Sequence, residues 1–327
     1  MTILIVSYSN DAHVERVQQA LYAQQRKLFR LNLDEFPVNY QCLQQFSPQQ
    51  ITGHIANTVS GELLNFADIS AVWLRKPAKF KFATELTTQE REFATQESEH
   101  FIFGMLFSLD CFWLSHPLAM RSAQWKGEQQ IRARRFGFDI PPSTITNAPE
   151  AVRQFKSAVN SDIVYKAMSS AELAADKVDA TDIQSHGVGT TIIDETLMDN
   201  IEAVSIAPCH FQQFIDKKAE IRVTVVGERI FAAKMFSPTA ATFVDSRNFA
   251  EQLSYAVITL PADIASRCIE MTKSYGLNYS AIDLLLTQDG QLQFLELNPN
   301  GQFLYIEQLL PDLPISSAVA ELLSRDM

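Results

Sequence analysis

The sequence has few cysteines, and their arrangement suggests neither a metal centre nor a disulfide scaffold. Its 327 residues include four cysteines, which are widely separated and form no CxxC pair: Cys42, Cys111, Cys209 and Cys268. Zinc sites and disulfide-rich domains need cysteines at short, paired spacings. This usage is typical of proteins in the reducing cytoplasm, where we expect the chain to act.

Segments for secretion or membrane crossing are also missing, and there is no excess of positive charge. Met1 leads directly into the apolar run at residues 3–6 with no basic region or cleavage site, and no apolar run approaches the length of a membrane span. The net charge of −11 argues against a general nucleic-acid-binding protein. With 46% hydrophobic and 20% charged residues, the chain can bury the cores of about two or three domains. We expect no nucleic-acid partner and no membrane association.

Glycine is missing from the turn where a dinucleotide-binding protein needs it. The strand predicted at residues 3–6, the helix started by Asp11 and the strand at residues 31–33 indicate a right-handed βαβ unit. The turn between the first strand and the helix reads SYSNDAH. Without glycine, its backbone cannot approach a pyrophosphate closely. We therefore predict a Rossmann-like unit that does not bind a nicotinamide cofactor.

The most informative stretch is residues 281–301, AIDLLLTQDGQLQFLELNPNG. The Asp-Gly pair at 289–290 is typical of a two-residue hairpin turn. Counting outward from that turn, Asp283 faces Glu296, and Asn298 lies on the same face because strand side chains alternate. The other positions are mostly apolar on both faces, which indicates a buried pair of strands.

Two carboxylates that face each other across a hairpin repel, because their β-carbons are about 5 Å apart. Burying them without partners would cost still more free energy. A shared proton, an arginine or a divalent cation would each relieve the repulsion. Aspartate, glutamate and asparagine oxygens form a ligand set that magnesium prefers, especially together with phosphate oxygens. The alternative is a solvent-exposed hairpin edge on which the two carboxylates never meet.

Two lysines and a glycine-containing segment also attract attention. Lys126 precedes a predicted helix, and Lys166 ends the predicted strand IVYK. The segment SHGVGTT at 185–191 has the small side chains of a loop that covers phosphates. Taken singly, a lysine that ends a strand is more typical of a solvated side chain, and the segment at 185–191 is more typical of a simple turn.

A second hairpin is predicted in EIRVTVVGERIFAAKMF. The Gly-Glu pair at 227–228 suits a type II′ turn, in which glycine comes first. This register places Glu220 and Arg222 on one strand face and Lys234 on the opposite face.

These features occur in the order found in ATP-grasp ligases, and the sequence resembles one group of them. The segments that carry the resemblance are ILIVSYSNDAHVERVQQAL, LNLDEFP, AVWLRKP, FQQFI, EIRVTVVG and FLELNPNGQFLYIE. They are similar to the ATP-grasp enzymes that macrocyclise ribosomal peptides, the microviridin-type or graspetide synthetases, over almost the whole chain. The resemblance implies an α/β (α+β) chain with an ATP-grasp fold and a Rossmann-like pre-ATP-grasp domain at the N-terminus. The implied regions are the pre-ATP-grasp domain at 1–118, a central ATP-grasp subdomain at 119–207 and a C-terminal subdomain with the acidic hairpin at 208–327.

The resemblance also implies ATP and Mg²⁺ as cofactors and assigns residues to them. The residues assigned to ATP are Lys126, Lys166, Gln212, Gln213, Phe214, Ile215, Glu220 and Asn298. The residues assigned to magnesium are Asp283, Glu296 and Asn298. The residues assigned to catalysis are Arg222, Lys234, Asp245 and Arg247, of which the last two match the family's D-x-R motif. The residues assigned to the substrate are Arg75 and Asn300.

Two positions depart from the family pattern. Trp125 precedes Lys126 where many relatives have asparagine, and Gly127 follows it. Ser246 occupies a position that is usually aromatic. The first departure concerns the role of Lys126 and the second concerns substrate preference.

The function implied by the resemblance is ATP-dependent peptide macrocyclisation. Aspartate or glutamate side chains of a precursor peptide, which has a leader and an acidic core, become acyl phosphates. Serine or threonine hydroxyls then form ω-esters, or lysine amines form ω-amides, with release of ADP and phosphate. A homodimer is expected by analogy with the family. Two alternatives are an ATP-grasp ligase that joins amino acids or short peptides to a small carboxylate, and a non-catalytic peptide-binding scaffold.

Overall fold

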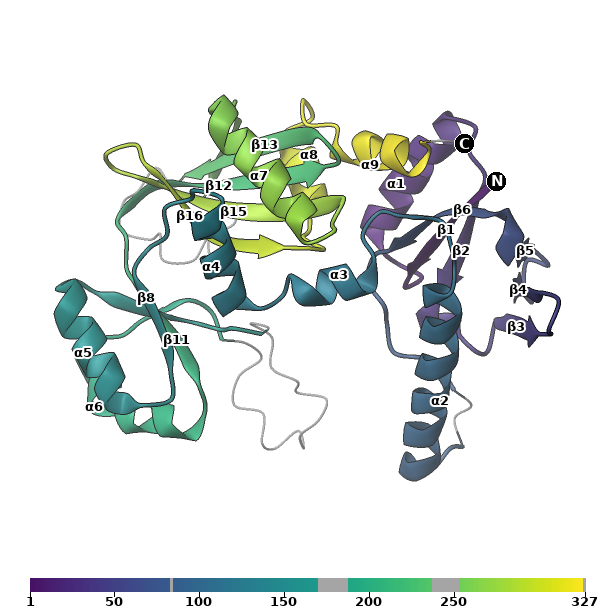
Figure 1. The fold of residues 1–327 in the computed structure, drawn as a ribbon, viewed down its shortest axis with the longest axis horizontal. Helices are drawn as coiled ribbons and strands as arrows, with labels where there is room; N and C mark the ends of the chain where they lie inside the picture. Colours follow the sequence, from purple (N-terminus) through teal and green to yellow (C-terminus); the bar gives the residue numbers. More distant parts are fainter. Residues whose placement is uncertain (83–84, 170–187, 237–252, 326–327) are drawn as a thin grey trace.

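The computed structural model describes residues 1–82, 85–169, 188–236 and 253–325. Figure 1 shows the N-terminal domain at one end of an elongated molecule, joined through α3 (Pro117–Ser122) to two further sheets. No helix in these residues is long and apolar enough to cross a membrane.

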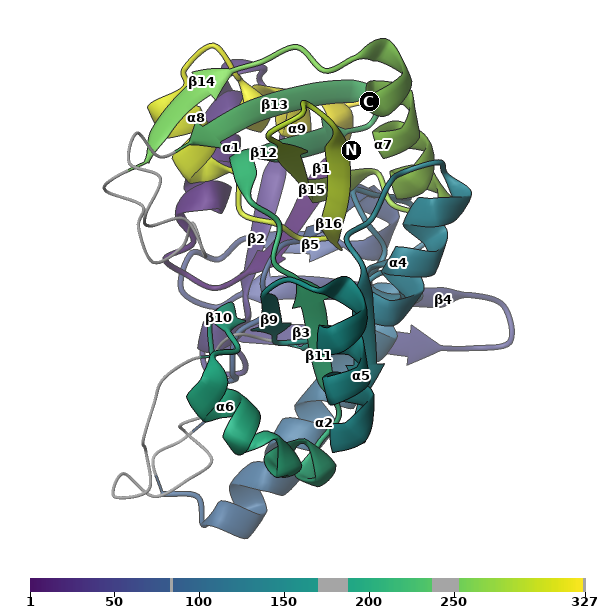
Figure 2. The same cartoon turned by 90° about the vertical axis from the view of Figure 1, so that its left-hand side faces the viewer.

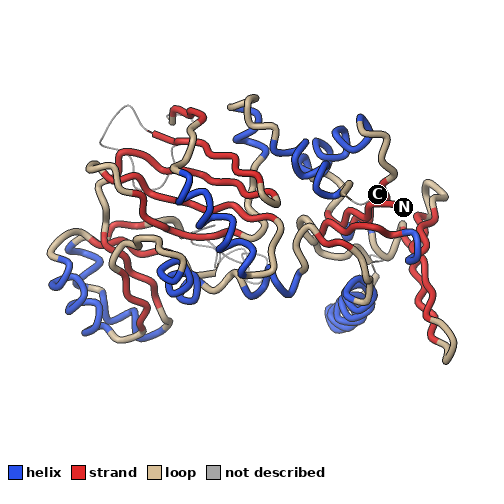
Figure 3. The backbone as a smooth tube through the Cα atoms, turned by 45° about the horizontal axis from the view of Figure 1, so that its top comes forward, coloured by secondary structure: helices blue, strands red, loops and turns tan. Residues whose placement is uncertain are grey.

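The N-terminal domain is built on a parallel sheet with strand order β2-β1-β6-β7. Asp11 caps the first helix by accepting a hydrogen bond from the backbone N–H of His13, and the parallel pairing of β1 with β2 confirms the predicted βαβ unit. A smaller sheet, β3-β4-β5, projects from this domain (Figure 3). The elements are β1 (Thr2–Ser7), α1 (Ala12–Ala23), β2 (Leu28–Asn32), η1 (Leu33–Glu35), β3 (Tyr40–Phe46), β4 (Ile51–Asn57), β5 (Leu63–Asn65), η2 (Phe66–Asp68), β6 (Ile69–Leu74), α2 (Thr88–Phe107) and β7 (Phe112–Trp113).

The central subdomain has an antiparallel sheet with strand order β10-β9-β11-β8. Helix α5 packs on one face through Val152, Ile163 and Phe211. The elements are β8 (Ser143–Thr146), α5 (Pro149–Val159), β9 (Ile163–Lys166), β10 (Thr191–Ile192), α6 (Glu195–Asp199), η5 (Ile201–Ile206) and β11 (Cys209–Gln213). Helix α4 (Lys126–Arg135), which precedes them in the chain, packs against β16 of the C-terminal sheet. The boundary expected at 207/208 therefore falls too early, because β11 returns to pair with β8 and β9.

The C-terminal subdomain has a five-stranded sheet with order β14-β13-β12-β15-β16. Helices α4 and α7 cover one face of it, where Ile221, Val223, Ile282 and Leu284 are buried. Figure 2 shows this sheet above the central subdomain. The elements are β12 (Lys217–Val226), β13 (Arg229–Phe236), β14 (Ser254–Val257), α7 (Ala262–Ser274), β15 (Tyr279–Thr287), β16 (Leu292–Asn298), α8 (Leu304–Leu309) and α9 (Ile315–Leu323).

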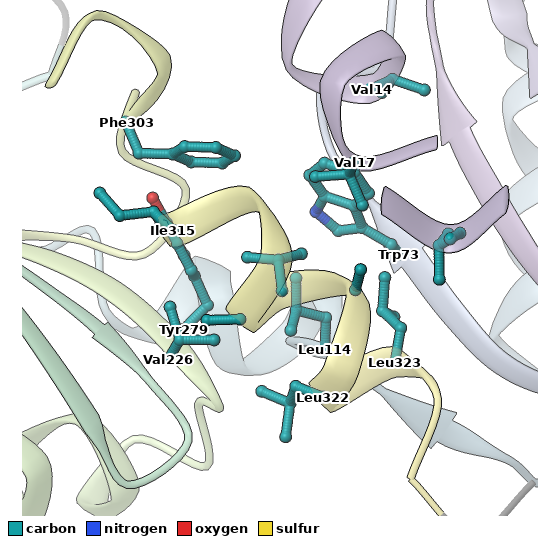
Figure 4. Packing of buried hydrophobic residues seen from close by; sticks show 14 of the residues in the cluster. Val14, Val17, Trp73, Leu114, Val226, Tyr279, Phe303, Ile315, Leu322 and Leu323 are labelled. Atoms are coloured by element: carbon teal, nitrogen blue, oxygen red, sulfur yellow. The ribbon is translucent and has the colours of Figure 1, made fainter. Parts of the chain in front are cut away.

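A single hydrophobic core joins the N-terminal domain to the C-terminal subdomain. Helix α9 packs against α1, and the core contains Val17 and Trp73 from the first domain with Phe303, Ile315 and Leu323 from the last (Figure 4). Burial of apolar side chains stabilises such a junction by about 25 cal/mol per Å². The N-terminal domain is thus packed directly against the subdomain that carries the acidic hairpin.

Candidate active site

The two acids predicted to face each other do so. Asp283 in β15 pairs directly with Glu296 in β16. Asn298 lies two residues further along, and its Nδ2 donates to Glu296 Oε1 at 2.9 Å and to Asp283 Oδ2 at 3.5 Å. Three oxygen-bearing side chains therefore converge on one face of the hairpin.

The turn of this hairpin differs from the two-residue turn that we expected. The N–H of Gly290 donates to the carbonyl of Thr287, and the N–H of Thr287 donates to the carbonyl of Gln291, so three residues form the loop. Only Gly290 in this loop takes a left-handed φ, of 87°. The longer loop shifts the pairing by one residue, and an extra residue in β16, Leu295, forms a β-bulge that shifts it back. The predicted acid pair is correct because these two deviations cancel.

Each of the two carboxylates has a cation beside it. The Nε of Arg222 in β12 lies 2.8 Å from Asp283 Oδ1, and Lys126 Nζ contacts Glu296 Oε2. The ion pair between Arg222 and Asp283 is close but poorly aligned. Arg222 Nε and Asp283 Oδ1 therefore both lack a hydrogen-bond partner among the described residues. With side chains of Asp283 and Glu296 only 17% and 35% exposed, the alternative of a solvent-exposed hairpin edge is wrong.

The surroundings shift the pKa values of the two acids in opposite directions. Burial raises the pKa of Asp283, and the neighbouring Glu296 adds to this shift against the opposing charge of Arg222. Burial also acts on Glu296, but Lys126 outweighs it and lowers the pKa of this carboxyl below its usual range. Glu296 therefore carries a firm negative charge at the centre of the site.

Helix α4 holds the edge strand that carries Glu296. An edge strand leaves half of its backbone groups unpaired. Here the side chain of Gln129 accepts from the N–H of Leu297 at 3.0 Å and donates to its carbonyl at 2.8 Å, while Gln130 donates to the carbonyl of Leu295 at 3.0 Å. Sequence reasoning missed both glutamines, because two polar residues in a polar helix carry no signal of their tertiary contacts.

The second lysine lies in the same electrostatic environment. Lys166 ends β9 with a half-buried side chain, and desolvation lowers the pKa of its amine, although the charges of Glu296 and Glu220 oppose the shift. Lys126 is the first residue of α4, directly after the exposed Trp125. Two lysines and a carboxylate therefore gather where the hairpin meets the central sheet, an arrangement suited to phosphate groups together with a cation.

The run from Gln212 to Ile215, which the resemblance assigns to ATP, has only part of its backbone free for a ligand. The N–H of Gln213 donates to the carbonyl of Pro142 at 2.9 Å, and the N–H of Phe214 donates to that of Asp162 at 2.8 Å. Two of the backbone N–H groups in this run are therefore already used within the protein.

Strand β11 also contributes two polar side chains to the Lys166 face. His210 pairs directly with Lys166, so both side chains lie on one face, and Gln212 lies two residues further on. Both are buried, and neither His210 Nε2 nor Gln212 Nε2 has a hydrogen-bond partner in the described part of the chain. Unpaired buried groups of this kind are costly unless a ligand satisfies them. Sequence reasoning assigned Gln212 to ATP but did not identify His210.

His210 leads to a prediction about pH. Burial, with the charges of Lys166 and Lys126, lowers the pKa of its imidazole to about 4 from the ordinary 6.5. As the pH falls below 6.5, the unfolded chain takes up the proton first, so stability is lost between pH 6.5 and 4, by up to about 3 kcal/mol. Urea unfolding across this range should show a steeper loss for the wild type than for His210→Gln. Identical pH profiles would contradict the assigned burial of a neutral imidazole.

The remaining predicted residues do not all join this group. Glu220 pairs with Lys217 at 2.5 Å, and its charge acts on both Lys166 and Asp283. Lys234 pairs with Ile221, which confirms that it lies on the face opposite Arg222, and its amine sits over the ring of Phe236. The geometry therefore does not bring Lys234 together with the other residues assigned to catalysis.

Two further assignments lie elsewhere. Arg75 and Asn300 contact each other at the junction with the N-terminal domain. Asp245, Ser246 and Arg247, and the first part of the segment at 185–191, lie outside the described residues.

The hairpin fits magnesium better than it fits a protein-only metal site. No group of three His, Cys, Asp or Glu side chains in the described ranges could hold a metal alone. Two carboxylates and an amide would leave further positions to phosphate oxygens and water, as magnesium commonly requires. Asp283 Oδ1 lies beside Arg222 but accepts no aligned hydrogen bond from the described residues, which is consistent with such a ligand set.

Comparisons with known proteins place this geometry in context. Residues 2–121 match the family model described as the MvdD pre-ATP grasp domain. No curated protein matches the sequence. The macrocyclase MdnC from Microcystis aeruginosa MRC, in a crystal structure with the precursor peptide MdnA, is 33% identical, with 99% of each chain covered and a TM-score of 0.85.

Two other solved structures are similar over their full length. A RiPP-associated ATP-grasp ligase from Chryseobacterium gregarium, in complex with ADP and a leader and core peptide, is 27% identical. The match covers 100% of this chain and 97% of the ligase chain, with a TM-score of 0.88. The macrocyclase MdnB from Microcystis aeruginosa MRC is 26% identical, with 99% of each chain covered and a TM-score of 0.81.

Proposed function

Since this chain belongs to the ATP-grasp ligases that macrocyclise ribosomal peptides, and is therefore an ATP-dependent ligase, we propose that it closes rings in a precursor peptide through its Asp or Glu side chains. The observation that carries this proposal is the 33% identity, over 99% of both chains, to a macrocyclase bound with its precursor peptide. The convergence of Asp283, Glu296 and Asn298 beside Arg222 and Lys126 supports the same reaction class.

The proposed reaction has two steps and needs no nucleophile from the protein. A peptide carboxylate oxygen attacks the γ-phosphorus of ATP, and the bond to the β-phosphate oxygen breaks to give an acyl phosphate and ADP. A hydroxyl or amine of the same peptide then attacks the acyl carbon. The carbon–oxygen bond to phosphate breaks, and the proton of the nucleophile leaves with phosphate or solvent. The peptide loses one water for each ring.

The protein contributes position and charge to these steps. We assign Lys126 and Lys166 to the ATP phosphates, the backbone of Gln213 to Ile215 to the adenine edge, Gln212 to ATP binding, and Glu220 to the ribose. Arg222, whose Nε has unused hydrogen-bonding capacity, is assigned to the phosphoryl group and to the acyl phosphate. Asp245 and Arg247 remain assigned to the phosphates or the acceptor, and Lys234 to catalysis on the resemblance alone.

Asp283, Glu296 and Asn298 would hold magnesium. The amide nitrogen of Asn298 faces both carboxylates, and a half-turn of the amide would present Oδ1 to a cation instead. When bound, magnesium neutralises charge on the phosphates and polarises them as a Lewis acid.

The partner and setting follow from the same family membership. We assign a precursor peptide with a leader and an Asp/Glu-rich core, supported by the leader and core peptide in the Chryseobacterium ligase structure. A cytoplasmic location is supported by the four cysteines, all of which are free.

We also assign a homodimer, supported by the apolar tip of the β3–β4 hairpin. Phe46 and Ile51 pair there with 69% and 66% of their surface exposed, so the tip presents two adjacent large apolar side chains to solvent. Sedimentation of the wild type and Phe46→Asp tests this assignment, since a monomeric wild type would contradict it.

Co-expression with a small acidic peptide encoded beside this chain's gene tests the proposed reaction. Mass spectrometry should show the peptide lighter by whole water molecules, and purified enzyme should convert ATP to ADP in step with ring closure. ADP formation with free amino acids or short peptides, and no water loss from the precursor, would favour the small-carboxylate ligase. Peptide binding with no ADP formation would favour the non-catalytic scaffold.

A further inference from the structure

The loop that follows the acid-bearing strand is held by the N-terminal domain. Residues 299–303 connect β16 to α8. Arg75, at the end of β6, donates from Nη1 to the carbonyl of Asn300 at 3.1 Å and to its Oδ1 at 3.0 Å. Asn300 Nδ2 donates back to the carbonyl of Arg75. This reciprocal contact fixes the side chain and the backbone of both residues.

Two further side chains hold the same loop. His13 of α1 accepts at Nε2 from the N–H groups of Phe303 and Leu304, each at 3.3 Å. Tyr279 Oη donates to the carbonyl of Gly301 at 2.7 Å. The loop is therefore attached to the N-terminal domain at both ends and to β15 in the middle. Figure 4 shows the apolar side of this junction, where Phe303 and Tyr279 lie near Trp73.

Gly301 connects the loop to the catalytic residues. A Cβ at this position would lie 2.3 Å from the Cβ of Ala281, and 3.4 Å from both Arg222 Nη1 and Asn298 Cβ. The loop backbone thus packs directly on the strand that carries Asp283 and against the Arg222 guanidinium. Any displacement of the loop would move the surface on which that guanidinium rests.

Arg75 is poorly placed to bind a substrate itself. Only 4% of the residue is exposed, and Nη1 is occupied by Asn300. The buried Asp11 lies within electrostatic reach of Arg75, whose charge helps to lower the pKa of that carboxyl against the effect of burial. The surroundings of Arg75 are therefore those of a structural contact between domains.

We propose that Arg75 and Asn300 form a positioning pair through which the N-terminal domain sets the places of Arg222 and Asn298. This role replaces the substrate contact that the sequence resemblance implied for these two residues. It rests on the proposed ATP-dependent ligase reaction, because it assigns the pair to the geometry of that same site.

Kinetics separate positioning from substrate binding. Arg75→Ala should lower kcat about 100-fold, the size expected when a misplacement of about 1 Å reaches reacting groups, and leave KM for the peptide unchanged. Asn300→Ala should have a similar effect, and the double variant should be no worse than either single variant, because the two residues act as one unit. If the two losses multiply, or if only the peptide KM changes, the pair is not a positioning unit.

Nucleotide binding tests the same inference without a peptide. Calorimetry of ADP with and without Mg²⁺ should show a magnesium-dependent gain in affinity that falls about tenfold in Arg75→Ala and Asn300→Ala. Arg75→Lys should recover only part of it, because lysine cannot reproduce the planar donor fork of arginine. An unchanged magnesium-dependent gain in both alanine variants would overturn the proposal.

Arg16→Ala is the matched control. Arg16 also links the N-terminal domain to the C-terminal subdomain, through a 3.3 Å contact with Glu307, but its side chain is 54% exposed and its partner belongs to α8, beyond the loop at 299–303. This variant should bind Mg²⁺ and ADP like the wild type.

Should Arg75→Ala not fold, Asn300→Ala carries both tests. Absence of peptide cyclisation by the wild type would reject the proposed function while leaving the calorimetric result decisive for the loop.

Discussion

Glu296→Gln is expected to abolish ADP formation, with a fall in kcat/KM of about 1,000-fold. The substitution preserves the shape of the side chain but removes the charge that Lys126 contacts and that lies against Asn298. It also removes the acid that is most firmly ionised in the site, because Lys126 lowers the pKa of Glu296. A magnesium ion bound there would lose a ligand and much of the charge that attracts it.

Steady-state ADP release and calorimetry of ADP with Mg²⁺ both measure this effect. Glu202→Gln is a suitable control, because Glu202 pairs with Arg153 at 2.6 Å on the surface of the central subdomain. The control should retain wild-type turnover, since exposed ion pairs contribute at most about 1 kcal/mol. Retention of more than about a tenth of wild-type ADP formation by Glu296→Gln would remove the acidic hairpin from the nucleotide site.

The acidic hairpin could be predicted because its signals are local. Apolar residues on both faces, a turn dipeptide and period-two alternation all lie within residues 281–301. The bulge at Leu295 could not be predicted, because no local pattern marks it; the carbonyl of Leu295 accepts from Gln130 of α4, a residue far away in the sequence. The one-residue error at the turn and the bulge happened to cancel, so the acid pair was correct although the expected turn was not.

Features set by contacts distant in sequence were harder to predict. Strand β11 returns to a sheet formed by residues far earlier in the chain, which moves the subdomain boundary beyond Gln213. The N–H groups of Gln213 and Phe214 are used by Pro142 and Asp162, a fact that no local pattern contains. The resemblance to the family predicted the order of the motifs along the chain. It did not predict that Arg75 and Asn300 contact each other, which only the structure shows.

Arg222→Lys is expected to lower kcat about 100-fold to 1,000-fold with little change in ADP affinity. The guanidinium lies against Asp283 on one side and the backbone of Gly301 on another. Burial raises the pKa of the nearby Tyr305, so this phenol stays neutral and does not add a second negative charge beside the guanidinium. Arginine can donate to Asp283 and to a phosphoryl oxygen at the same time through its planar fork. The lysine ammonium is a point charge, so it would remain with Asp283 and leave the developing charge of the transferred phosphoryl group without its donor.

Arg222→Ala should be worse than Arg222→Lys for a different reason. It leaves Asp283 buried without its cation, which raises the pKa of that carboxyl further and weakens it as a magnesium ligand. Magnesium-dependent ADP binding should therefore fall in Arg222→Ala but persist in Arg222→Lys, whereas single-turnover ADP formation should fall in both. Arg229→Lys, on the neighbouring strand and paired at the surface with Glu321, is the control that should behave as wild type. Equal rates of the chemical step in Arg222→Lys and the wild type would mean that positive charge alone suffices at this position, and that the fork geometry of Arg222 has no part in phosphoryl transfer.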